Sequence, residues 1–590
     1  MSDASSAEAP AGRPQGWAPG AGTPSSWPAA SRGRRRTGGV AVSATQVRRG
    51  LLALLLVGVA YATLIQSFSW NQTSHYDLIR SLDKGGTTID AYQENTGDKV
   101  FYHHHWYSAR APGLALFALP WYKALTVVDA NRIARSSQAL RGEDEMVYFI
   151  GLWGNVLPGL VLLLLMWRMA ERFEPGYGAA AAAIVGLGTM VLPLSTLLFS
   201  HVFTAMLGFA AFALMLRERE GPPRPLLLAL AGLAMGYAVA SEYPLFFVGA
   251  VLGLYLLSRR DALTPPLVLA RAGSYIAGGL VGIIPLLLYN HAAFHSWTHL
   301  AYSDVPRQQK GFFGIGAPSL KVLGTLLFDS RGLLTISPVL IMGGVGTALL
   351  YKRGKRAEAL TIVGVCLCYV GYNSGYYLPF GGGFMGPRFL TTMLPFIGFP
   401  IALALRRYPG PTIALAGASI AATVIATITH PLVGYETETV VWMRYVGEGF
   451  FQPTIASALG LGRGWGAIWP FFLAAGAALV LAALALPRLR ISSRALLAGA
   501  GAVIAWALFA ALAPTVLGID HRGLLSIVGA GDHTALNLKL HDGSRYPLRT
   551  LAPAAAAAGL LALAAMYLLG ESRSRRTGSR GEPAAAAAAG

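Results

Sequence analysis

The sequence predicts an all-α polytopic membrane protein with about 14 transmembrane helices and large loops on one side of the membrane. Of its 590 residues, 54% are hydrophobic and 13% are charged, whereas soluble proteins average about 25% charged residues. Many apolar runs approach or exceed the ~20 residues that a helix needs to cross a bilayer. The net charge of +19 does not indicate nucleic-acid binding, because much of it flanks apolar runs, where basic residues orient membrane helices.

The chain begins and ends with polar tails around one membrane domain. Residues 1–48 are rich in Ala, Gly, Pro and Ser and then basic, which predicts a disordered cytoplasmic tail. A transmembrane domain is predicted over 49–570, with its first helix at 51–68, and a cytoplasmic tail over 571–590. The other expected spans are 147–167, 178–198, 200–216, 225–241, 243–258, 266–289, 333–351, 359–376, 389–405, 411–429, 466–486, 495–513 and 551–569.

The loops differ between the two sides of the membrane. With the N-terminus in the cytoplasm, every predicted inner segment is short or terminal and basic, as the positive-inside rule requires, and the C-terminus is also inside. The predicted outer segments are 69–146, 290–332, 377–388, 431–465 and 514–550. Elaborate sequence on one face places the expected active site on the extracytoplasmic side, where nucleotide sugars and ATP are absent. A donor there must arrive already activated, as a lipid-linked donor does. The Ala-, Gly- and Arg-rich composition indicates a bacterial inner (plasma) membrane.

The first outer loop contains a candidate surface helix. Residues 74–82 place apolar and charged side chains on opposite sides, which predicts a short amphipathic helix at the membrane surface. Ser74 is the expected N-cap with Asp77 at the third helical position, and Gly85 and Gly86 end the helix. Asp77 is therefore either a helix-capping acid or a catalytic residue.

Asp90 stands in a different setting. It follows a Gly-Gly-Thr-Thr stretch and precedes Tyr92, so it is expected in an extended or turning loop with no helix end to cap. One interpretation is a general base that removes a proton from an acceptor hydroxyl. The other is a loop acid paired with a nearby Lys or Arg.

Three consecutive histidines, His103, His104 and His105, raise the question of a metal site. Adjacent residues in an extended strand alternate sides, so one centre would use at most two of them. We predict instead that His105, with Tyr76 and Tyr107, contacts a sugar or phosphate near an aromatic wall. No cofactor is predicted, and a divalent metal stays open.

Arg110 lies just before the next apolar stretch, at the expected depth of the lipid headgroups. An arginine there can bind a phosphate through two parallel hydrogen bonds. The alternative is an interfacial arginine whose charged end only reaches for water. Pro112 and Gly113 are expected to fix a turn that aims Arg110 and Tyr107 into a cavity.

Other outer segments add cations and glycines. Arg307, Arg331 and Arg388 lie on the same predicted face as Arg110, and the four are expected to form a cationic rim for a lipid phosphate. The Phe312–Gly316 segment suits a re-entrant or cavity-lining turn, and the Gly381–Gly383 run allows close approach of the backbone.

Ionisable residues also stand at two predicted outer helix ends. Ser200-His201 begins one apolar run and Ser241-Glu242-Tyr243 follows another. Ionisable residues at such positions usually face a cavity. Glu242 is therefore a further candidate for substrate binding or for the base.

These residues resemble the GT-C superfamily of polyprenyl-phosphate-dependent membrane glycosyltransferases, of the bacterial aminoarabinose transferase and protein O-mannosyltransferase type. The similarity is good over 69–120, patchy over 285–395 and only topological beyond. The phrases that carry it are Ser74-His75-Tyr76, Thr88-Ile89-Asp90-Ala91-Tyr92, Thr96-Gly97-Asp98, Tyr107-Ser108-Ala109-Arg110-Ala111-Pro112-Gly113 and Gly386-Pro387-Arg388-Phe389-Leu390.

The resemblance implies a GT-C-like fold and transfer of a sugar, with inversion, from a polyprenyl-phosphate donor to a lipid, glycan or protein acceptor outside the cytoplasm. It implies that Arg110 and Arg388 stabilise the departing polyprenyl phosphate. The chain departs from the family where an Asp-Glu pair supplies the proposed base, because Gln72 and Thr73 stand at the matching positions. Asp77 or Asp90 would have to take over that role.

Two other functions compete with a transferase. A transporter or flippase of lipid-linked sugars predicts charged residues in the middle of helices and elaborate loops on both faces; the sequence has few of the former and no clear case of the latter. A non-catalytic membrane scaffold is favoured by the loss of the expected Asp at position 72.

Overall fold

Helices make up most of the chain in the computed structural model, which describes residues 42–128, 144–259, 264–306, 308–309, 311–328, 331–432, 442–487, 489, 491–516 and 547–578. The predicted N-terminal tail lies outside the described residues up to position 41. The first helix begins at Ala44, inside the predicted tail, because Ser43 and Gln46 form a reciprocal capping box there. The last helix runs on to Gly578, and most of the predicted outer segment 514–550 is outside the described residues.

The elements follow in chain order, with 3-10 and π segments written η. They are α1 (Ala44–Thr63), α2 (Trp70–Asp83), η1 (Asp90–Asn95), β1 (Lys99–Tyr102), β2 (His105–Ser108), α3 (Gly113–Val127), α5 (Asp144–Gly151), η2 (Leu152–Val156), α6 (Leu157–Phe173), α7 (Gly178–Gly188), α8 (Val191–Leu194), α9 (Ser200–Arg219), α10 (Pro225–Ser241), α11 (Leu245–Leu257), α12 (Pro265–Phe294), η3 (Ala301–Asp304), α13 (Leu320–Phe328), α14 (Leu333–Ile336), α15 (Val339–Lys352), α16 (Arg356–Gly375), η4 (Arg388–Met393), α17 (Leu394–Gly398), α18 (Ile401–Arg407), α19 (Pro409–Thr429), α20 (Trp442–Glu448), α21 (Ile455–Ala458), η5 (Gly464–Gly466), α22 (Trp469–Ala485), α23 (Ser493–Val516) and α25 (Pro547–Gly578).

The apolar helices make this a multi-pass membrane protein. Among the described residues, seven helices are long and apolar enough to cross a bilayer, or up to nine if each of two sharply bent pairs is one span. Every predicted apolar run overlaps a helix, but several of these helices are shorter, such as α7, α10 and α11. The predicted count of 14 spans and the predicted orientation therefore stay predictions.

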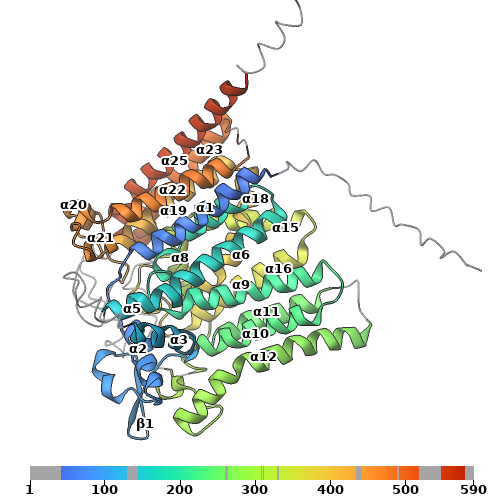
Figure 1. Ribbon diagram of the computed structural model, residues 1–590. Helices are drawn as coiled ribbons and strands as arrows, with labels where there is room; N and C mark the ends of the chain where they lie inside the picture. The colour runs from blue at the N-terminus through green and yellow to red at the C-terminus, as the bar shows by residue number, and fades with distance from the viewer. Residues whose placement is uncertain are drawn as a thin grey trace, which may run out of the picture. The chain divides into compact units, whose positions relative to one another are not determined.

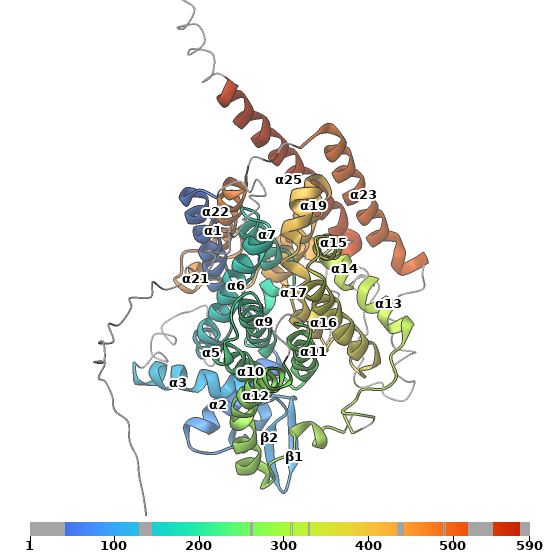
Figure 2. The ribbon, with the colours of Figure 1, turned by 90° about the vertical axis from the view of Figure 1, so that its right-hand side faces the viewer.

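The all-α prediction needs one addition, a two-stranded antiparallel hairpin in the first outer loop. β1 pairs with β2, with Lys99 opposite Ser108 and Tyr102 opposite His105. The helices α2 and α3 and this hairpin, all in blue, lie together at one end of the neighbouring helices in both ribbon views (Figures 1 and 2). A separate apolar cluster of α2, the hairpin, α3 and the end of α12 forms the core of this region.

Helices α10 and α12 lie in unusually close contact. A Cβ atom on Gly232 of α10 would lie 1.9 Å from the carbonyl oxygen of Tyr275, and one on Gly278 of α12 would lie 1.9 Å from that of Ala229. Small residues spaced four apart allow membrane helices to pack backbone against backbone. This contact fixes α10, whose C-terminal end carries Glu242, against the next long helix.

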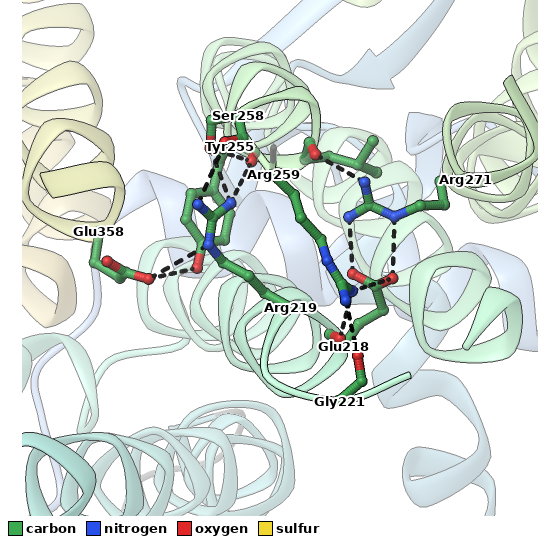
Figure 3. A network of polar contacts seen from close by, with 9 residues as sticks. Glu218, Arg219, Gly221, Tyr255, Ser258, Arg259, Arg271 and Glu358 are labelled. Carbon is green, nitrogen blue, oxygen red and sulfur yellow. Dashed lines mark hydrogen bonds and ion pairs between the residues drawn. The ribbon is translucent and has the colours of Figure 1, made fainter. Parts of the chain in front are cut away.

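The opposite ends of α9, α11 and α12 are held by buried charges (Figure 3). Arg271 binds both oxygens of Glu218, through Nε at 3.0 Å and Nη2 at 2.8 Å. Arg259 adds a contact of 3.2 Å to Glu218 and donates to the carbonyl oxygens of Glu218 and Gly221. Beside this cluster, Arg219 interacts with Glu358 of α16. The helices are thus pinned together on the side predicted to be cytoplasmic.

Candidate active site

Helix α2 begins earlier than predicted. It starts at Trp70, after Ser69 in an extended conformation, so the prediction that Ser74 is its N-cap is wrong. The hydroxyl of Ser74 instead donates to the carbonyl oxygen of Asp98 at 2.6 Å and lies 2.8 Å from Oγ of Ser108. These bonds attach the helix to the base of the hairpin. The helix ends as predicted, with Gly85 at a positive φ of 78°.

Asp77 lies in the middle of α2 rather than in its first turn, so it is not a capping acid. Its side chain is fully buried and contacts Nη2 of Arg80 at 2.5 Å. Nδ2 of Asn95 lies 3.4 Å away. The guanidinium of Arg80 in turn covers the ring of Tyr76 at 4.3 Å and that of Tyr92 at 3.8 Å. Asp77 thereby anchors the segment that follows the helix.

Asp90 is held at an exposed edge of the hairpin. Its carboxylate accepts a hydrogen bond from the backbone N–H of Trp106 at 2.6 Å and lies 2.7 Å from Nδ1 of His105. Slight burial raises the pKa of Asp90, but these hydrogen bonds outweigh it and the pKa lies below its usual value. The geometry matches a paired loop acid, with a histidine as the partner.

The histidine run is a turn rather than an extended strand. His103 and His104 have positive φ values of 45° and 67° and connect the two strands, so the predicted alternation of the three histidines is wrong. A two-residue connection with two positive φ angles suits the right-handed twist of a hairpin. Only His105 belongs to β2, and its ring faces Asp90.

Arg110 leaves the hairpin toward the helices. Its Nη2 lies 2.5 Å from Asp98, and its backbone N–H donates to Oγ of Ser108 at 3.1 Å. Gly113 then packs on the end of α10, where a Cβ would lie 2.2 Å from Oγ of Ser241, and its carbonyl accepts from the hydroxyl of Tyr237. A glycine is therefore required at position 113 by the close approach of its backbone to Ser241, and not by the backbone conformation of a turn. The loop is docked one residue before Glu242.

Glu242 forms a buried pair with His201 at the start of α9. Its Oε1 lies 2.8 Å from Nδ1 of His201, and its Oε2 accepts from the hydroxyl of Thr204 at 2.9 Å. Ser200 lies 3.5 Å from the same oxygen. The exposed fractions of the two side chains are 5% for His201 and 7% for Glu242.

Arg388 reaches the same place from the glycine-rich segment. It begins η4, is buried, and lies over the ring of Phe199 at 5.0 Å. Gly381 has a positive φ of 76°, and a Cβ there would lie 2.7 Å from Nε of Arg388. The ring of the next residue, Phe389, lies edge-on to His201 at 5.5 Å. The close backbone approach predicted for the Gly381–Gly383 run is thus made by Gly381 to the side chain of Arg388.

Electrostatic interactions connect Arg110 with this pair. The charges of Arg110 and Glu242 both affect the pKa of Tyr302 in η3. The charges of Arg110 and His201 both affect the pKa of His75 in α2. Burial by itself lowers the pKa of Arg110, but the carboxylate of Asp98 and the neighbouring tyrosines offset it, so the pKa lies above its usual value. Arg110 is therefore a permanent cation that shares its neighbours His75 and Tyr302 with the buried His–Glu pair.

Two tyrosines and a glutamine complete the surroundings of Arg110. Tyr376 and Tyr377, just after α16, both interact with its charge. Tyr376 accepts a hydrogen bond from Nε2 of Gln308 at 2.9 Å and packs edge-on against Phe389 at 5.5 Å. The predicted turn at Phe312–Gly316 lies against these tyrosines, since the backbone N–H of Tyr377 donates to the carbonyl of Gly314.

The structure thus brings together three of the predicted site residues, Arg110, Glu242 and Arg388, and separates others. Tyr76 and Tyr107 belong to the apolar core under the first loop. Arg331 is buried, where it donates to the carbonyl oxygen of Phe384 at 3.1 Å and covers the ring of Phe380. It supports the glycine-rich segment from within, and the predicted rim of four arginines stays a prediction. Arg307 lies outside the described residues. Any role of these residues in binding substrate stays a prediction.

The residues that sequence reasoning missed are His75, Tyr302 and Tyr376. His75 was visible only inside the Ser74-His75-Tyr76 phrase, and the two tyrosines only as aromatics next to glycine-rich turns. Gln72, at the position of the family's Asp, is buried and fully engaged. Its amide donates to the carbonyl of Ser67 at 2.9 Å and accepts from the backbone N–H of Leu198 at 3.0 Å. This side chain ties α2 to the segment before α9.

His75 predicts a dependence of stability on pH. Burial, together with the charges of Arg110 and His201, lowers its pKa to about 3. In the unfolded chain a histidine titrates near 6.5, so between pH 6.5 and 3 the unfolded state binds more protons and stability falls as the pH falls. We expect a loss of about 2 kcal/mol between pH 7 and pH 5 from this residue alone.

The measurement is the free energy of unfolding in detergent at both pH values. His75→Asn, which cannot take up a proton, should show a smaller loss than the wild type between pH 7 and pH 5. Equal losses in the two proteins would assign the pH dependence to other groups.

Within the described part of the chain, no group of three or more His, Cys, Asp and Glu side chains is arranged to hold a metal ion. His105 faces only Asp90, and His201 faces only Glu242 among the acidic residues.

No family model matches the chain, and no curated protein matches it by sequence. Among solved structures it is similar to ArnT from Cupriavidus metallidurans bound to undecaprenyl phosphate, with a TM-score of 0.43 and 15% identity, covering 74% of this chain and 77% of that one. It is also similar to the archaeal oligosaccharyltransferase AglB from Archaeoglobus fulgidus in complex with an inhibitory peptide and a dolichol-phosphate, with a TM-score of 0.38 and 12% identity. That match covers 73% of this chain and 55% of the oligosaccharyltransferase, so the chain spans about half of that protein's length.

Proposed function

We propose that this protein is a membrane glycosyltransferase that moves a sugar from a polyprenyl-phosphate donor to an extracytoplasmic lipid, glycan or protein acceptor, with inversion at the anomeric carbon. The observation that carries the proposal is that two arginines from segments far apart in the chain, the partly buried Arg110 and the buried Arg388, both interact with the surroundings of the Glu242–His201 pair.

The charges suit a phosphate leaving group. When the bond between the sugar and the phosphate breaks, the departing polyprenyl phosphate gains a negative charge. Guanidinium groups fixed where charge develops stabilise a transition state more strongly in a dry site than in water. Nη2 of Arg110 is paired with Asp98. Nε of Arg110 has no hydrogen-bond partner among the described residues, so its N–H can donate to a phosphate oxygen.

The surroundings also suit a sugar and a lipid. Tyr302, Tyr376 and Tyr377 place hydroxyl groups and ring faces next to Arg110. Small-molecule sites combine apolar and aromatic walls with a few placed polar groups in this way. Two of the similar solved proteins were captured with an undecaprenyl or a dolichol phosphate. For this chain, however, the proposal of a lipid-phosphate donor depends on its own Arg110 and Arg388.

The competing functions fit less well. A flippase must present its site alternately to both faces, but these residues lie at helix ends next to the first loop, and the opposite ends of α9, α11 and α12 are closed by the Glu218 cluster. A scaffold has no need for a buried carboxylate and imidazole next to Arg388, since burying ionisable groups costs free energy even when they are paired.

The test is transfer by the full-length protein in membranes from a panel of radiolabelled undecaprenyl-phosphate sugars. We expect label from at least one donor to leave the lipid fraction and appear in an acceptor, in a reaction that needs no nucleotide sugar. Absence of transfer from every donor, together with no binding of undecaprenyl phosphate to the purified protein, would overturn the proposal.

A further inference from the structure

The base of the proposed reaction is not supplied by the residue that sequence resemblance leads one to expect. Gln72 stands at that position and its amide is engaged at both ends. Asp77 is fully buried against Arg80, and Asp90 is exposed at the hairpin edge with its oxygens held by His105 and Trp106. A base must lie beside the reacting groups, so it has to be sought near Arg110 and Arg388.

The Glu242–His201 pair has the geometry of a general base and its orienting carboxylate. One carboxylate oxygen of Glu242 holds Nδ1 of His201 at 2.8 Å, and the other is held by Thr204 at 2.9 Å. An ionised carboxylate at Nδ1 favours the tautomer with its proton on that nitrogen, which leaves Nε2 free to accept one. The same arrangement of nucleophile-activating histidine and carboxylate recurs on unrelated folds.

The unused nitrogen of His201 is the second observation. Its Nε2 is buried and has no hydrogen-bond partner among the described residues. The same holds for both ring nitrogens of His75 and for Nε of Arg110. Buried polar atoms are usually paired, because an unpaired one costs about 1–3 kcal/mol. Arg110 and His201 both interact electrostatically with His75, so these atoms from three segments point to a polar ligand shared by them.

His201 is surrounded by aromatic rings and by charged or titratable groups. Its ring lies edge-on to Phe199 at 6.0 Å and to Phe389 at 5.5 Å, so two aromatic rings flank it. The charged or titratable groups that interact with the pair include Arg388 from η4, His75 from α2, Tyr302 from η3, and Tyr369 and Tyr372 from α16. Arg388, one of the two cations expected to hold the phosphate, therefore interacts with the carboxylate that positions His201.

We propose that His201 is the general base of this transfer and that Glu242 is the positioning residue that orients and stabilises it. This inference rests on the proposed function and assigns the base within the same site. It also implies that the acceptor group is a hydroxyl, whose proton is removed as it attacks.

The step balances without another reactant. The acceptor oxygen forms a bond to the anomeric carbon, while the bond between that carbon and the phosphate oxygen breaks. The proton of the acceptor hydroxyl passes to Nε2 of His201, and the bonding electron pair leaves with the phosphate, which departs as polyprenyl phosphate. The imidazolium formed is stabilised by the carboxylate of Glu242 on its other nitrogen, and the new phosphate charge by Arg110 and Arg388.

The experiment compares His201→Gln, His201→Ala and Glu242→Gln with the wild type, using the undecaprenyl-phosphate sugar that the wild type turns over. General base catalysis contributes about 10²–10⁴-fold, so we expect kcat to fall by about that factor in both His201 variants. KM for the donor, binding of undecaprenyl phosphate and the unfolding midpoint should stay near their wild-type values in His201→Gln. Glu242→Gln should reduce kcat because the amide no longer fixes the tautomer.

Chemical rescue separates a base from a packing residue. Free imidazole should restore part of the activity of His201→Ala. It should not restore that of Glu242→Gln, which still has its own imidazole and serves as the matched control. Transfer by His201→Gln within tenfold of the wild type would overturn the inference, and so would the absence of rescue, or a loss of kcat that parallels loss of undecaprenyl phosphate binding.

The failure of this inference differs from the failure of the proposed function. A wild-type protein that transfers no sugar from the panel overturns the proposed function, and the inference falls with it. A wild type that transfers sugar, with His201 variants that do so equally well, leaves the transferase in place and removes His201 as its base. Asp90→Asn and Asp77→Asn would then be measured in the same assay, and the larger loss would identify the acid that acts instead.

Discussion

Arg388→Gln is expected to lower the rate of sugar transfer by about 10²–10³-fold, the usual effect of removing one fixed donor to a developing anion. Arg388 is the cation next to the His201–Glu242 pair, and it is held rigidly between Phe199 and the backbone of Gly381. A glutamine keeps hydrogen-bonding groups there but supplies no charge. Because the charge on the phosphate grows as it leaves, the loss should fall mainly on kcat and less on donor binding.

Arg110→Gln should act in the same direction, and the double variant should lose less than the product of the two single effects. Groups that stabilise one leaving phosphate act as a unit, so their removal is not additive. The measurement is kcat and KM for one labelled donor, with binding of undecaprenyl phosphate and of undecaprenol followed separately. Only binding of the phosphate should weaken in these variants.

Arg444→Gln is the matched control. Arg444 lies in a predicted outer segment and is exposed, with Glu448 as its partner on the same short helix. Removing its charge changes the net charge of the protein by the same amount, and transfer should not change. An Arg388→Gln protein that transfers sugar at the wild-type rate would show that the leaving phosphate is not stabilised here.

Much of the fold could be predicted because each membrane helix is formed by one continuous apolar segment of the sequence. Each apolar run overlaps a helix, and the elaborate first loop contains a helix where one was predicted. The amphipathic surface character predicted for that helix is wrong, because Asp77 and Arg80 of its predicted polar face are buried. The helix boundaries were less predictable where two residues could each begin the same helix. Ser74 has the chemistry of an N-cap, but its hydroxyl is used by Asp98, and Ser69 begins the helix without a side-chain cap.

The site was predictable only in part, since its members come from segments that the sequence does not connect. Arg110, Glu242 and Arg388 were each suggested by a local pattern, a residue at headgroup depth, at a helix end or beside glycines. Nothing local shows that Gly113 docks on Ser241, or that His75 and His201 interact. In the same way Arg331 has the pattern of a rim cation, and only tertiary packing places it beneath Phe384.

Glu218→Gln is expected to lower the free energy of unfolding by about 3–5 kcal/mol, the cost of removing one partner of a buried ion pair. The carboxylate of Glu218 is 1% exposed and Arg271 is 2% exposed. Arg271 makes two parallel hydrogen bonds to it, and Arg259 makes a third from the end of α11 (Figure 3). A glutamine leaves the guanidinium of Arg271 buried without the carboxylate that binds it, and it also removes one charged partner of Arg259.

The measurement is unfolding in detergent, with Glu448→Gln as the control for loss of an exposed carboxylate, which should leave stability unchanged. The double variant Glu218→Gln with Arg271→Gln should be more stable than Glu218→Gln alone, because it removes the arginine that has lost both of its bonds to the carboxylate. A Glu218→Gln protein as stable as the wild type would show that these charges are reached by water.

The same variant separates the two ends of α9. Glu218 and His201 lie 17 residues apart on this helix, about 26 Å at the usual rise per residue. If the Glu218 cluster only pins α9, α11 and α12 together, then Glu218→Gln should unfold at a lower temperature yet transfer sugar at the wild-type kcat below that temperature. A fall in kcat while the protein is still folded would instead mean that the position of His201 depends on the far end of its helix. In that case the buried charges on the predicted cytoplasmic side would be part of what aligns the base with the two arginines.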